Sequence, residues 1–394
     1  MKVIDLFAGC GGMSSGFVKA GYTIHAAVEF DPIIASTYIQ NHPYVRMIVD
    51  DIKNVDHQKV FKENDAEVII GGPPCQGFSM AGARIRNGFI DDPRNYLFKH
   101  YFNIVKTVKP KAFVMENVKG MLTMHGGEIF AEIQKLFSNS ELLDGEPYHL
   151  YCKVINALDY GVPQKRERLI IIGTKLSTVD FEQKWRETKA EIENDFPGFF
   201  DAVNILDAIG NLPATHASGI VRNPVPQNAY QRYLATNNEL LHNHNPSRHS
   251  AAAVERMRNI ANGENYTVLN ESINSVHSGS YGRMCWEDPA VTITTRFDTP
   301  AGGRFIHPVE NRTITPREAA RIQSFSDDFV FYGDKRSISR QIGNAVPVGL
   351  ARAIGQMLIA VANKNAEIVV KRTRGTSVHD KIQNAIRIGG VSKC

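Results

Sequence analysis

The sequence predicts an α/β protein with a doubly wound, mostly parallel sheet and a second, smaller inserted domain. Within the first third of its 394 residues, short apolar runs alternate with segments of helical pattern, which is the rhythm of βαβ units. After about residue 176 this rhythm ends, and residues 177–310 are rich in Asn, Gly, Pro, His and Ser. Ligands of such sheets bind at the carboxyl ends of the strands. Functional side chains are therefore expected where strands end.

Each expected element has a local signal. The strands of the first part are residues 2–8, 23–29, 45–49, 68–71, 112–115 and 169–173. Asp31 and Pro32 open a helix as its N-cap and first helical residue. Residues 96–108 show helical periodicity that stops before Pro110.

Four segments are expected along the chain. They are the sheet-forming part (1–176), the inserted domain (177–310), a closing part (311–363) and a basic tail (364–394). In the closing part we expect a short helix over residues 316–325 and a longer one over 346–363. The longer helix should return to pack beside the N-terminal part of the sheet.

The composition is that of an ordinary globular protein, with 43% hydrophobic and 22% charged residues. No apolar run approaches the ~20 residues of a membrane span, and the N-terminus does not resemble a signal peptide. The five cysteines are scattered without a C-x-x-C pair, which argues against a zinc site or a disulfide framework and for a reducing cytoplasm. A net charge of +4 permits a nucleic-acid partner but does not require one.

The first turn reads DLFAGCGGMSSG and lies between a strand and a helix, the context of a nucleotide-binding loop. Gly9, Gly11 and Gly12 let the backbone approach a ligand closely. Ser14 takes the last place of the G-x-G-x-x-G pattern, which makes a dinucleotide a poorer fit.

Acidic and aromatic residues follow at the next strand ends. Glu29 can accept both hydroxyls of a ribose, and Asp51 can accept from an exocyclic amine. Phe7 and Phe30 can flank a flat base. The alternatives are a tight turn with solvated acids, and ordinary core packing for the two phenylalanines.

Residues 71–79, GGPPCQGFS, place Cys75 just after a buried strand. Two glycines permit unusual backbone angles, and two prolines then stiffen the loop. A stiff loop holds a side chain in one place, which suits a nucleophile. Taken alone, these nine residues fit an ordinary loop cysteine better.

The next strand ends in Glu116 and Asn117. Adjacent strands lie ~5 Å apart, so the Cys75 thiol and the Glu116 carboxyl can face one ligand. The run QKRER at 164–168 precedes a further strand, and its alternate residues Gln164, Arg166 and Arg168 would share one face if that strand extends back. A solvated terminal acid and a solvated charge cluster are the alternatives.

Together these motifs make the sequence resemble the C5-cytosine DNA methyltransferases. The matching stretches, in the family order, are DLFAGCGG, PPCQGFS, ENV, QKRER, REAARIQSF (317–325) and QIGNAVPV (341–348). The resemblance covers about residues 1–175 and 311–363, and it implies a Rossmann-like fold that binds S-adenosylmethionine. It also implies that residues 177–310 form the target-recognition domain.

The resemblance implies a mechanism in which the Cys75 thiolate adds to cytosine C6 and makes C5 nucleophilic. Glu116 would bind N3 and the exocyclic amine, Arg168 would donate to O2, and Arg166 would hold the loop that carries the thiol. C5 takes the methyl group of S-adenosylmethionine, which leaves S-adenosylhomocysteine, and loss of the C5 proton expels Cys75. The base must first flip out of the duplex. No metal is needed.

The resemblance also assigns the remaining site residues. The catalytic motifs add Pro74, Asn117 and Gln164. The expected cofactor residues are Phe7, Gly9, Gly11, Gly12, Glu29, Phe30, Asp51, Ile52, Pro73, Leu97, Asn344 and Val346.

Within the recognition domain, AVTITT (290–295) resembles a short Thr motif of the family and places Thr292 near the DNA backbone. Arg283, Arg296 and Arg304 lie among glycines and aromatics. For each of them a phosphate contact or plain surface is a better interpretation than base readout.

The expected substrate is a specific sequence of double-stranded DNA. We expect a cytoplasmic, bacterial, monomeric enzyme that associates with the nucleoid through DNA and does not bind a membrane. It would protect DNA beside a restriction endonuclease that shares the target without needing to bind the enzyme. One rival interpretation is methylation of tRNA cytosines, and another is a DNA-binding relative that has lost catalysis.

Overall fold

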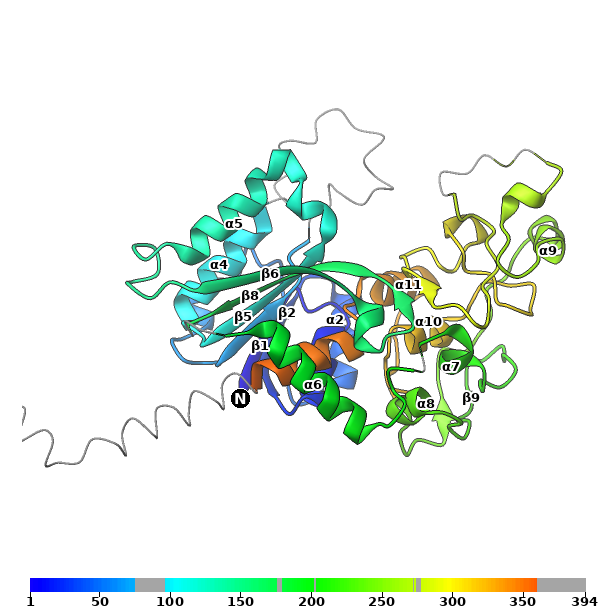
Figure 1. Ribbon diagram of the computed structural model, residues 1–394, viewed down its shortest axis with the longest axis horizontal. Coiled ribbons are helices and arrows are strands. Elements are labelled where there is room, and N and C mark those ends of the chain that lie inside the picture. Colours follow the sequence, from blue (N-terminus) through cyan, green and yellow to red (C-terminus); the bar gives the residue numbers. More distant parts are fainter. Residues whose placement is uncertain (75–95, 176–178, 202, 272, 274–277, 360–394) are drawn as a thin grey trace, which may run out of the picture.

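The computed structural model describes residues 1–74, 96–175, 179–201, 203–271, 273 and 278–359. Its centre is a seven-stranded sheet with the strand order β3-β2-β1-β4-β5-β8-β6 (Figure 1). The strands are β1 (Lys2–Leu6), β2 (Thr23–Glu29), β3 (Arg46–Val49), β4 (Val68–Gly71), β5 (Ala112–Val118), β6 (His149–Asn156) and β8 (Glu167–Thr174). Strands β1 to β5 pair in parallel, whereas β8 is antiparallel to both β5 and β6. The predicted mostly parallel α/β sheet is confirmed.

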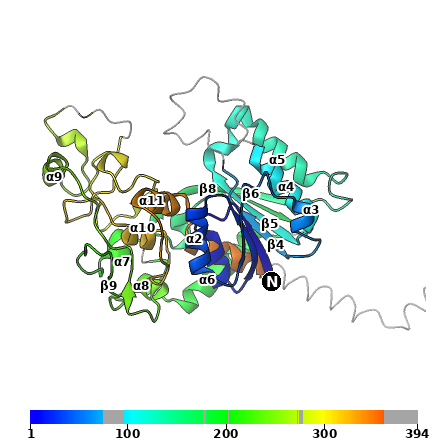
Figure 2. The same ribbon diagram turned by 180° about the vertical axis from the view of Figure 1, so that it is seen from behind.

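Helices cover both faces of this sheet (Figures 1 and 2). The helices of this part are α1 (Gly12–Lys19), α2 (Pro32–Asn41), α3 (His57–Val60), α4 (Leu97–Val108), α5 (Glu128–Ser138) and α6 (Phe181–Asp195). On one face, Ile4 and Ile69 pack into a cluster with apolar residues of α4 and α5. On the other face, Val3 and Ile70 pack with residues of α1, α6 and the last described helix.

The helix ends follow local chemistry. The Asp31 side chain accepts from the backbone N–H groups of Ile33 and Ile34 at the start of α2, with Pro32 as the first helical residue. Helix α4 ends where Lys109 takes a left-handed conformation (φ 51°) ahead of Pro110. Both boundaries therefore agree with the sequence signals.

The rest of the chain forms a lobe of short elements beside the sheet. Its helices are α7 (Ile205–Ile209), α8 (Ala229–Leu234), α9 (Ala251–Arg258), α10 (Pro316–Ile322) and α11 (Lys335–Asn344). Its two-residue strands are β9 (Val221–Arg222) with β10 (Leu240–Leu241), and β11 (Ala290–Val291) with β7 (Gln164–Lys165). Short 3-10 helices lie at Lys119–Leu122, Met124–Gly127, Ala157–Tyr160, Tyr266–Val268 and Pro300–Gly302. One large apolar cluster joins α7, α8, α10 and α11.

Several boundaries differ from the expected ones. Strand β1 ends at Leu6 because Phe7 adopts a left-handed backbone (φ 59°). Strand β5 continues to Val118, so Glu116 and Asn117 lie inside it rather than beyond it. Helix α10 ends at Ile322, and the residues from 348 to 359 form a separate helix after a break at 345–347.

Helix α6 was not expected, because its 15 residues were interpreted as part of a loop-rich segment. Its Phe181 packs into the same cluster as Leu350 and Ile354 of the last helix. That helix lies against the N-terminal part of the sheet as expected: the Tyr22 hydroxyl donates to the Gly355 carbonyl at 3.1 Å.

Among the described residues, the stretch Lys335–Ile359, which joins α11 and the last helix across the break at 345–347, is long and apolar enough to cross a membrane by length and composition alone. However, 78% of its most apolar stretch is buried inside the protein. This burial is typical of core helices in globular proteins.

Candidate active site

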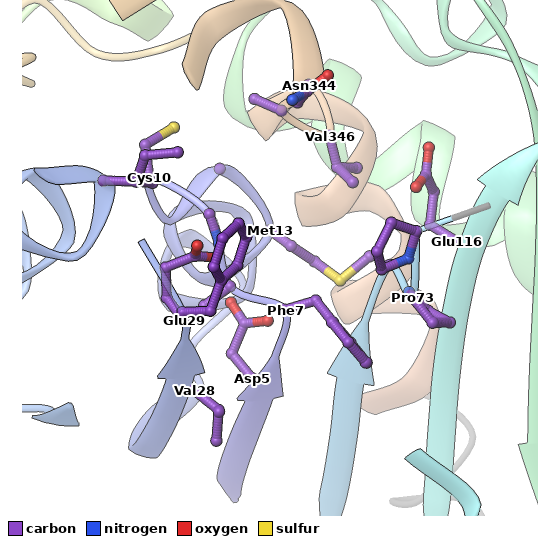
Figure 3. Close-up of a pocket in the computed structure, with 18 of the residues that line it drawn as sticks. Asp5, Phe7, Cys10, Met13, Val28, Glu29, Pro73, Glu116, Asn344 and Val346 are labelled. Atoms are coloured by element: carbon purple, nitrogen blue, oxygen red, sulfur yellow. The ribbon is translucent and has the colours of Figure 1, made fainter. Parts of the chain in front are cut away.

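A cavity of about 640 Å³ opens at the carboxyl ends of β1, β2, β4 and β5 and is closed on another side by the end of α11 (Figure 3). Its walls are formed by residues of the glycine loop, ENV, QKRER and QIGNAVPV, which lie far apart in the sequence. The expected cofactor residues that line it are Phe7, Gly9, Gly12, Glu29, Phe30, Asp51, Ile52, Pro73, Leu97, Asn344 and Val346. The expected catalytic residues that line it are Pro74, Glu116, Asn117, Arg166 and Arg168.

The glycine loop is packed too tightly for side chains. A Cβ atom at Gly12 would lie 2.6 Å from the Val346 carbonyl oxygen. Gly11 does not line the cavity, but it has φ of 96° and sits against His42, where a Cβ would come within 2.7 Å of the ring. The loop therefore needs glycine both for its backbone angles and for its contact with the last motif.

Glu29 occupies the end of β2. Its two carboxylate oxygens accept from the Gly9 N–H at 2.9 Å and the Asp31 N–H at 3.0 Å. Burial raises the pKa of this carboxyl, and these backbone hydrogen bonds oppose the rise. Next to it, Phe30 is 61% exposed, which leaves its ring free to pack on a ligand.

Asp51 lies in the cavity wall just after β3, where its side chain pairs with Lys53 at 3.1 Å. The Lys53 hydrogen bonds hold the pKa of Asp51 below its ordinary value despite an opposing desolvation. Ile52 beside it is buried. This wall combines an ionised carboxylate with an apolar surface, which suits the amine and the ring of a base.

Sequence reasoning missed Asp5, which also lines the cavity. Its Oδ2 accepts from Ser14 Oγ at 2.6 Å, and Ser14 Oγ lies 2.7 Å from the Tyr38 hydroxyl. Burial raises the pKa of Asp5 to about 7. The available signal was the position of an acid within the strand that leads into the glycine loop.

At the other end of the cavity, Glu116 Oε1 and Arg168 Nε form an ion pair at 2.8 Å. The pair is largely buried, with side-chain exposures of 12% and 13%. It joins the neighbouring antiparallel strands β5 and β8. A Cβ at Gly72 would lie 3.0 Å from Glu116 Oε2, so the glycine leaves room for this carboxylate.

Asn117 fixes the start of the loop that leads to the cysteine. Its Nδ2 donates to the Pro73 carbonyl at 2.8 Å, across the parallel pair of β4 and β5. Cys75 itself lies outside the described residues, so the expectation that its thiol faces Glu116 stays a prediction. Another cysteine in this region, Cys10, is buried, and burial raises the pKa of its thiol to about 12.

The run QKRER alternates as expected. Gln164 and Arg166 are buried, Arg168 faces the cavity, and the intervening Lys165 and Glu167 are exposed. Arg166 donates to the carbonyls of Ile293, Gly343 and Ala345 at 3.0–3.1 Å. Gln164 accepts from the Ile293 N–H and donates to Gln323 Oε1. These two side chains therefore hold the Thr motif (290–295) and the last motif (341–348) in place through hydrogen bonds.

The four residues expected to contact DNA differ in their contacts within the protein. Arg283 is buried, and its guanidinium donates to the carbonyls of Met257, Ile260, His307 and Glu310 and to Asn311 Oδ1. These contacts give Arg283 a structural role. Arg304 donates to two backbone carbonyls, and Thr292 Oγ1 donates to the Lys165 carbonyl. Arg296 is exposed.

The cavity fits S-adenosylmethionine in the chemistry of its walls. Glu29 offers carboxylate oxygens to a ribose, Asp51 offers one to an amine, and Asp5 offers a carboxyl to a cationic group. The glycine loop provides a close backbone approach between them. Within the described ranges there is no group of three or more His, Cys, Asp or Glu residues that could hold a metal ion.

Comparisons with known proteins agree with this geometry. Residues 1–360 match the family model described as C-5 cytosine-specific DNA methylase. Type II methyltransferase M1.HphI of Haemophilus parahaemolyticus is 36% identical over 370 residues, covering 91% of this chain and 87% of that protein. Type II methyltransferase M.DdeI of Desulfomicrobium norvegicum is 36% identical over 389 residues, covering 91% and 88%.

Solved structures are also similar to this chain. The crystal structure of a putative DNA modification methyltransferase encoded within an Escherichia coli prophage matches with a TM-score of 0.71 and 28% identity, covering 92% of this chain and 99% of that one. The Dnmt2 methyltransferase of S. pombe matches with a TM-score of 0.56 at 17% identity, covering 92% and 99%, which shows the fold alone. The chain belongs to the C-5 cytosine-specific DNA methylase family and is a DNA (cytosine-5-)-methyltransferase.

Proposed function

We propose that this enzyme transfers a methyl group from S-adenosylmethionine to C5 of a flipped-out cytosine in a specific sequence of double-stranded DNA, through a covalent adduct with Cys75. The main support is the Glu116–Arg168 pair at the cavity edge. Asn117, next to Glu116, holds the Pro73 carbonyl, two residues before Cys75. The acid, the guanidinium donor and the start of the nucleophile loop thus meet at one place.

The chemistry of each step follows from the residue types. The Cys75 thiolate adds to C6, and the electron pair of the C5–C6 double bond attacks the methyl group of S-adenosylmethionine at C5. S-adenosylhomocysteine leaves, the C5 proton is removed, and the Cys75–C6 bond breaks to return the thiolate. Glu116 binds N3 and the exocyclic amine, and Arg168 donates to O2. Because the ring faces are stacked inside a duplex, the base must flip out first.

For the cofactor we propose adenine between Phe30 and the Asp51 wall, with Ile52 and Leu97 as apolar neighbours. Glu29 accepts the ribose hydroxyls, and the methionine part lies along the glycine loop towards Asn344. All of these residues line one cavity, and its far end is the Glu116–Arg168 edge. This order would direct the methyl group towards the cytosine.

We propose that DNA lies between the sheet and the second lobe, which acts as the target-recognition domain. The proposed boundaries are 1–176, 177–310 and 311–363, followed by the tail. Because α6 packs on the sheet, the recognition surface itself would begin after Asp195. Thr292, Arg296 and Arg304 remain proposed DNA contacts, and Arg283 is left out because its donors are occupied within the protein.

The curated relatives are named as Type II methyltransferases. We therefore propose that the enzyme is the modification member of a restriction-modification system. It would act as a monomer in the bacterial cytoplasm, on DNA that a cognate endonuclease would otherwise cleave.

Methyl uptake tests this proposal. Purified protein is incubated with labelled S-adenosylmethionine and, separately, unmethylated DNA and unmodified tRNA, and the labelled product is mapped by bisulfite sequencing. We expect label at cytosine C5 within one short DNA motif, and none in reactions of Cys75→Ala. Label in tRNA alone would reassign the substrate, and unchanged DNA methylation by Cys75→Ala would refute the mechanism.

A further inference from the structure

The cavity presents an electrostatic problem to the proposed cofactor. Its lining includes five carboxyl side chains, which are Asp5, Glu29, Asp50, Asp51 and Glu116. S-adenosylmethionine carries an α-carboxylate besides its ammonium and sulfonium groups. A carboxylate placed among carboxyl groups needs a cation close by, because like charges repel strongly in a partly desolvated site.

Three of the four cationic side chains in the lining are already engaged. Lys53 pairs with Asp51 at 3.1 Å. Arg168 pairs with Glu116 and also donates to the Glu167 carbonyl. The Arg166 guanidinium donates to three backbone carbonyls.

Arg340 is the fourth cationic side chain, and its contact within the protein is weaker than those of the other three. In the part of the chain that the structure describes, its charged contact is Asp31, with 3.6 Å between Nη2 and Oδ2. That separation is too long for a hydrogen bond, and the Arg340 side chain is 43% exposed. Such a pair contributes little to stability, so the guanidinium is available to a stronger acceptor.

The position of Arg340 suits the amino-acid end of the cofactor. It lies on α11 one helical turn before Asn344, and both residues line the cavity. Side chains four residues apart lie on the same face of a helix. The contact residue Asp31 follows the proposed ribose ligand Glu29 by two residues, and the Asp31 N–H donates to the Glu29 carboxylate. The guanidinium therefore lies next to a neighbour of the proposed ribose ligand, on the helix that also carries Asn344.

On the basis of the proposed cofactor site, we propose that Arg340 binds the α-carboxylate of S-adenosylmethionine and S-adenosylhomocysteine, exchanging its loose contact with Asp31 for this one. The planar guanidinium can donate two parallel hydrogen bonds to a carboxylate, which the Asp31 contact does not provide. Arg340 is thus a cofactor-binding residue that links α11 to the start of α2 when the cofactor is present.

Calorimetric binding without turnover tests this assignment. The two ligands are S-adenosylhomocysteine and its decarboxylated analogue, which keeps the adenosine, the thioether and the amine. We expect Arg340→Ala to weaken S-adenosylhomocysteine binding by about tenfold, the scale of one charge-assisted pair. Binding of the decarboxylated analogue should stay within about twofold of wild type, which also reports that the variant is folded.

Two further variants sharpen the test. Arg336→Ala removes an exposed arginine one turn earlier on α11 that does not line the cavity, and it should bind both ligands like wild type. Asp31→Asn keeps an oxygen to cap α2 but removes the competing charge, so S-adenosylhomocysteine should bind as tightly as to wild type or more tightly.

Three outcomes would overturn the assignment. They are full S-adenosylhomocysteine affinity in Arg340→Ala, an equal loss for both ligands in that variant, and an equal loss in Arg336→Ala. If the wild-type protein bound neither ligand, the proposed cofactor site would fail and the role of Arg340 with it. If the wild-type protein binds both ligands and Arg340→Ala gives one of these results, only the role of Arg340 fails and the proposed cofactor site stands.

Discussion

The Asp5 carboxyl leads to a prediction for the substitution Asp5→Asn. Burial raises its pKa to about 7 from an ordinary 3.8; the Ser14 hydrogen bond opposes this rise and the Glu29 charge adds to it. The rise is about three units, and each unit corresponds to ~1.4 kcal/mol of difference between the two protonation states. The linked change in the free energy of unfolding is therefore at most about 4 kcal/mol.

The sign follows from the direction of the shift. Because the folded-state pKa is raised, the folded protein keeps the Asp5 proton over a range where the unfolded chain has released it. This contribution to stability is complete below about pH 4 and is lost as the pH rises through 7. Asn cannot ionise and still offers an oxygen to Ser14. Asp5→Asn should therefore gain stability relative to wild type between about pH 5 and about pH 8, on the order of 1–4 kcal/mol.

Urea unfolding of both proteins across this pH range measures the effect, and exposed Asp159→Asn controls for the loss of a negative charge. A difference between Asp5→Asn and wild type that is the same at every pH would refute the reasoning. A cationic cofactor beside Asp5 should also lower its pKa. Binding of S-adenosylmethionine near pH 7 should then release protons, which calorimetry in buffers of different ionisation enthalpy detects.

Three other substitutions probe the site. Glu116→Gln should lower kcat by about 10²–10⁴-fold, because it removes the acid and leaves Arg168 without its charged partner. Calorimetry should find S-adenosylhomocysteine binding little changed. Turnover at the wild-type rate would contradict the assigned role. Gly12→Ala should lower the thermal midpoint by several degrees, because its Cβ would lie 2.6 Å from a backbone oxygen; an unchanged melting curve would refute the close packing. Asn117→Ala removes the hydrogen bond to Pro73 and should lower the free energy of unfolding by about 1 kcal/mol. It should also reduce kcat more than cofactor affinity. Equal effects on kcat and affinity would contradict a role in the nucleophile loop.

The strands and the cofactor residues were predictable because their signals are local. β2 and β4 have the expected bounds, since apolar runs end at an acid or at glycines. Glu29 and Asp51 could be placed because parallel strands end at one edge of the sheet. The alternation of Gln164, Arg166 and Arg168 followed from the two-residue period of extended chain.

The missed features depend on contacts between distant segments. Arg166 and Arg283 donate to carbonyls up to 179 residues away, which no local pattern reveals. Helix α6 has weak amphipathicity, and its packing on the sheet comes from few residues such as Phe181. In the sequence, Asp5 is one residue of the first strand. Only the fold shows that its carboxyl is buried beside Ser14 and Tyr38.

The most direct test of the central claim is to trap the covalent step. DNA is copied with 5-fluorodeoxycytidine in place of deoxycytidine and incubated with the enzyme and S-adenosylmethionine, and the protein is then analysed by mass spectrometry after digestion. Fluorine at C5 cannot leave as a proton does, so the Cys75–C6 bond should persist, and we predict a methylated nucleotide attached to Cys75. Normal methylation of ordinary DNA together with no adduct, or an adduct at another residue, would contradict the account.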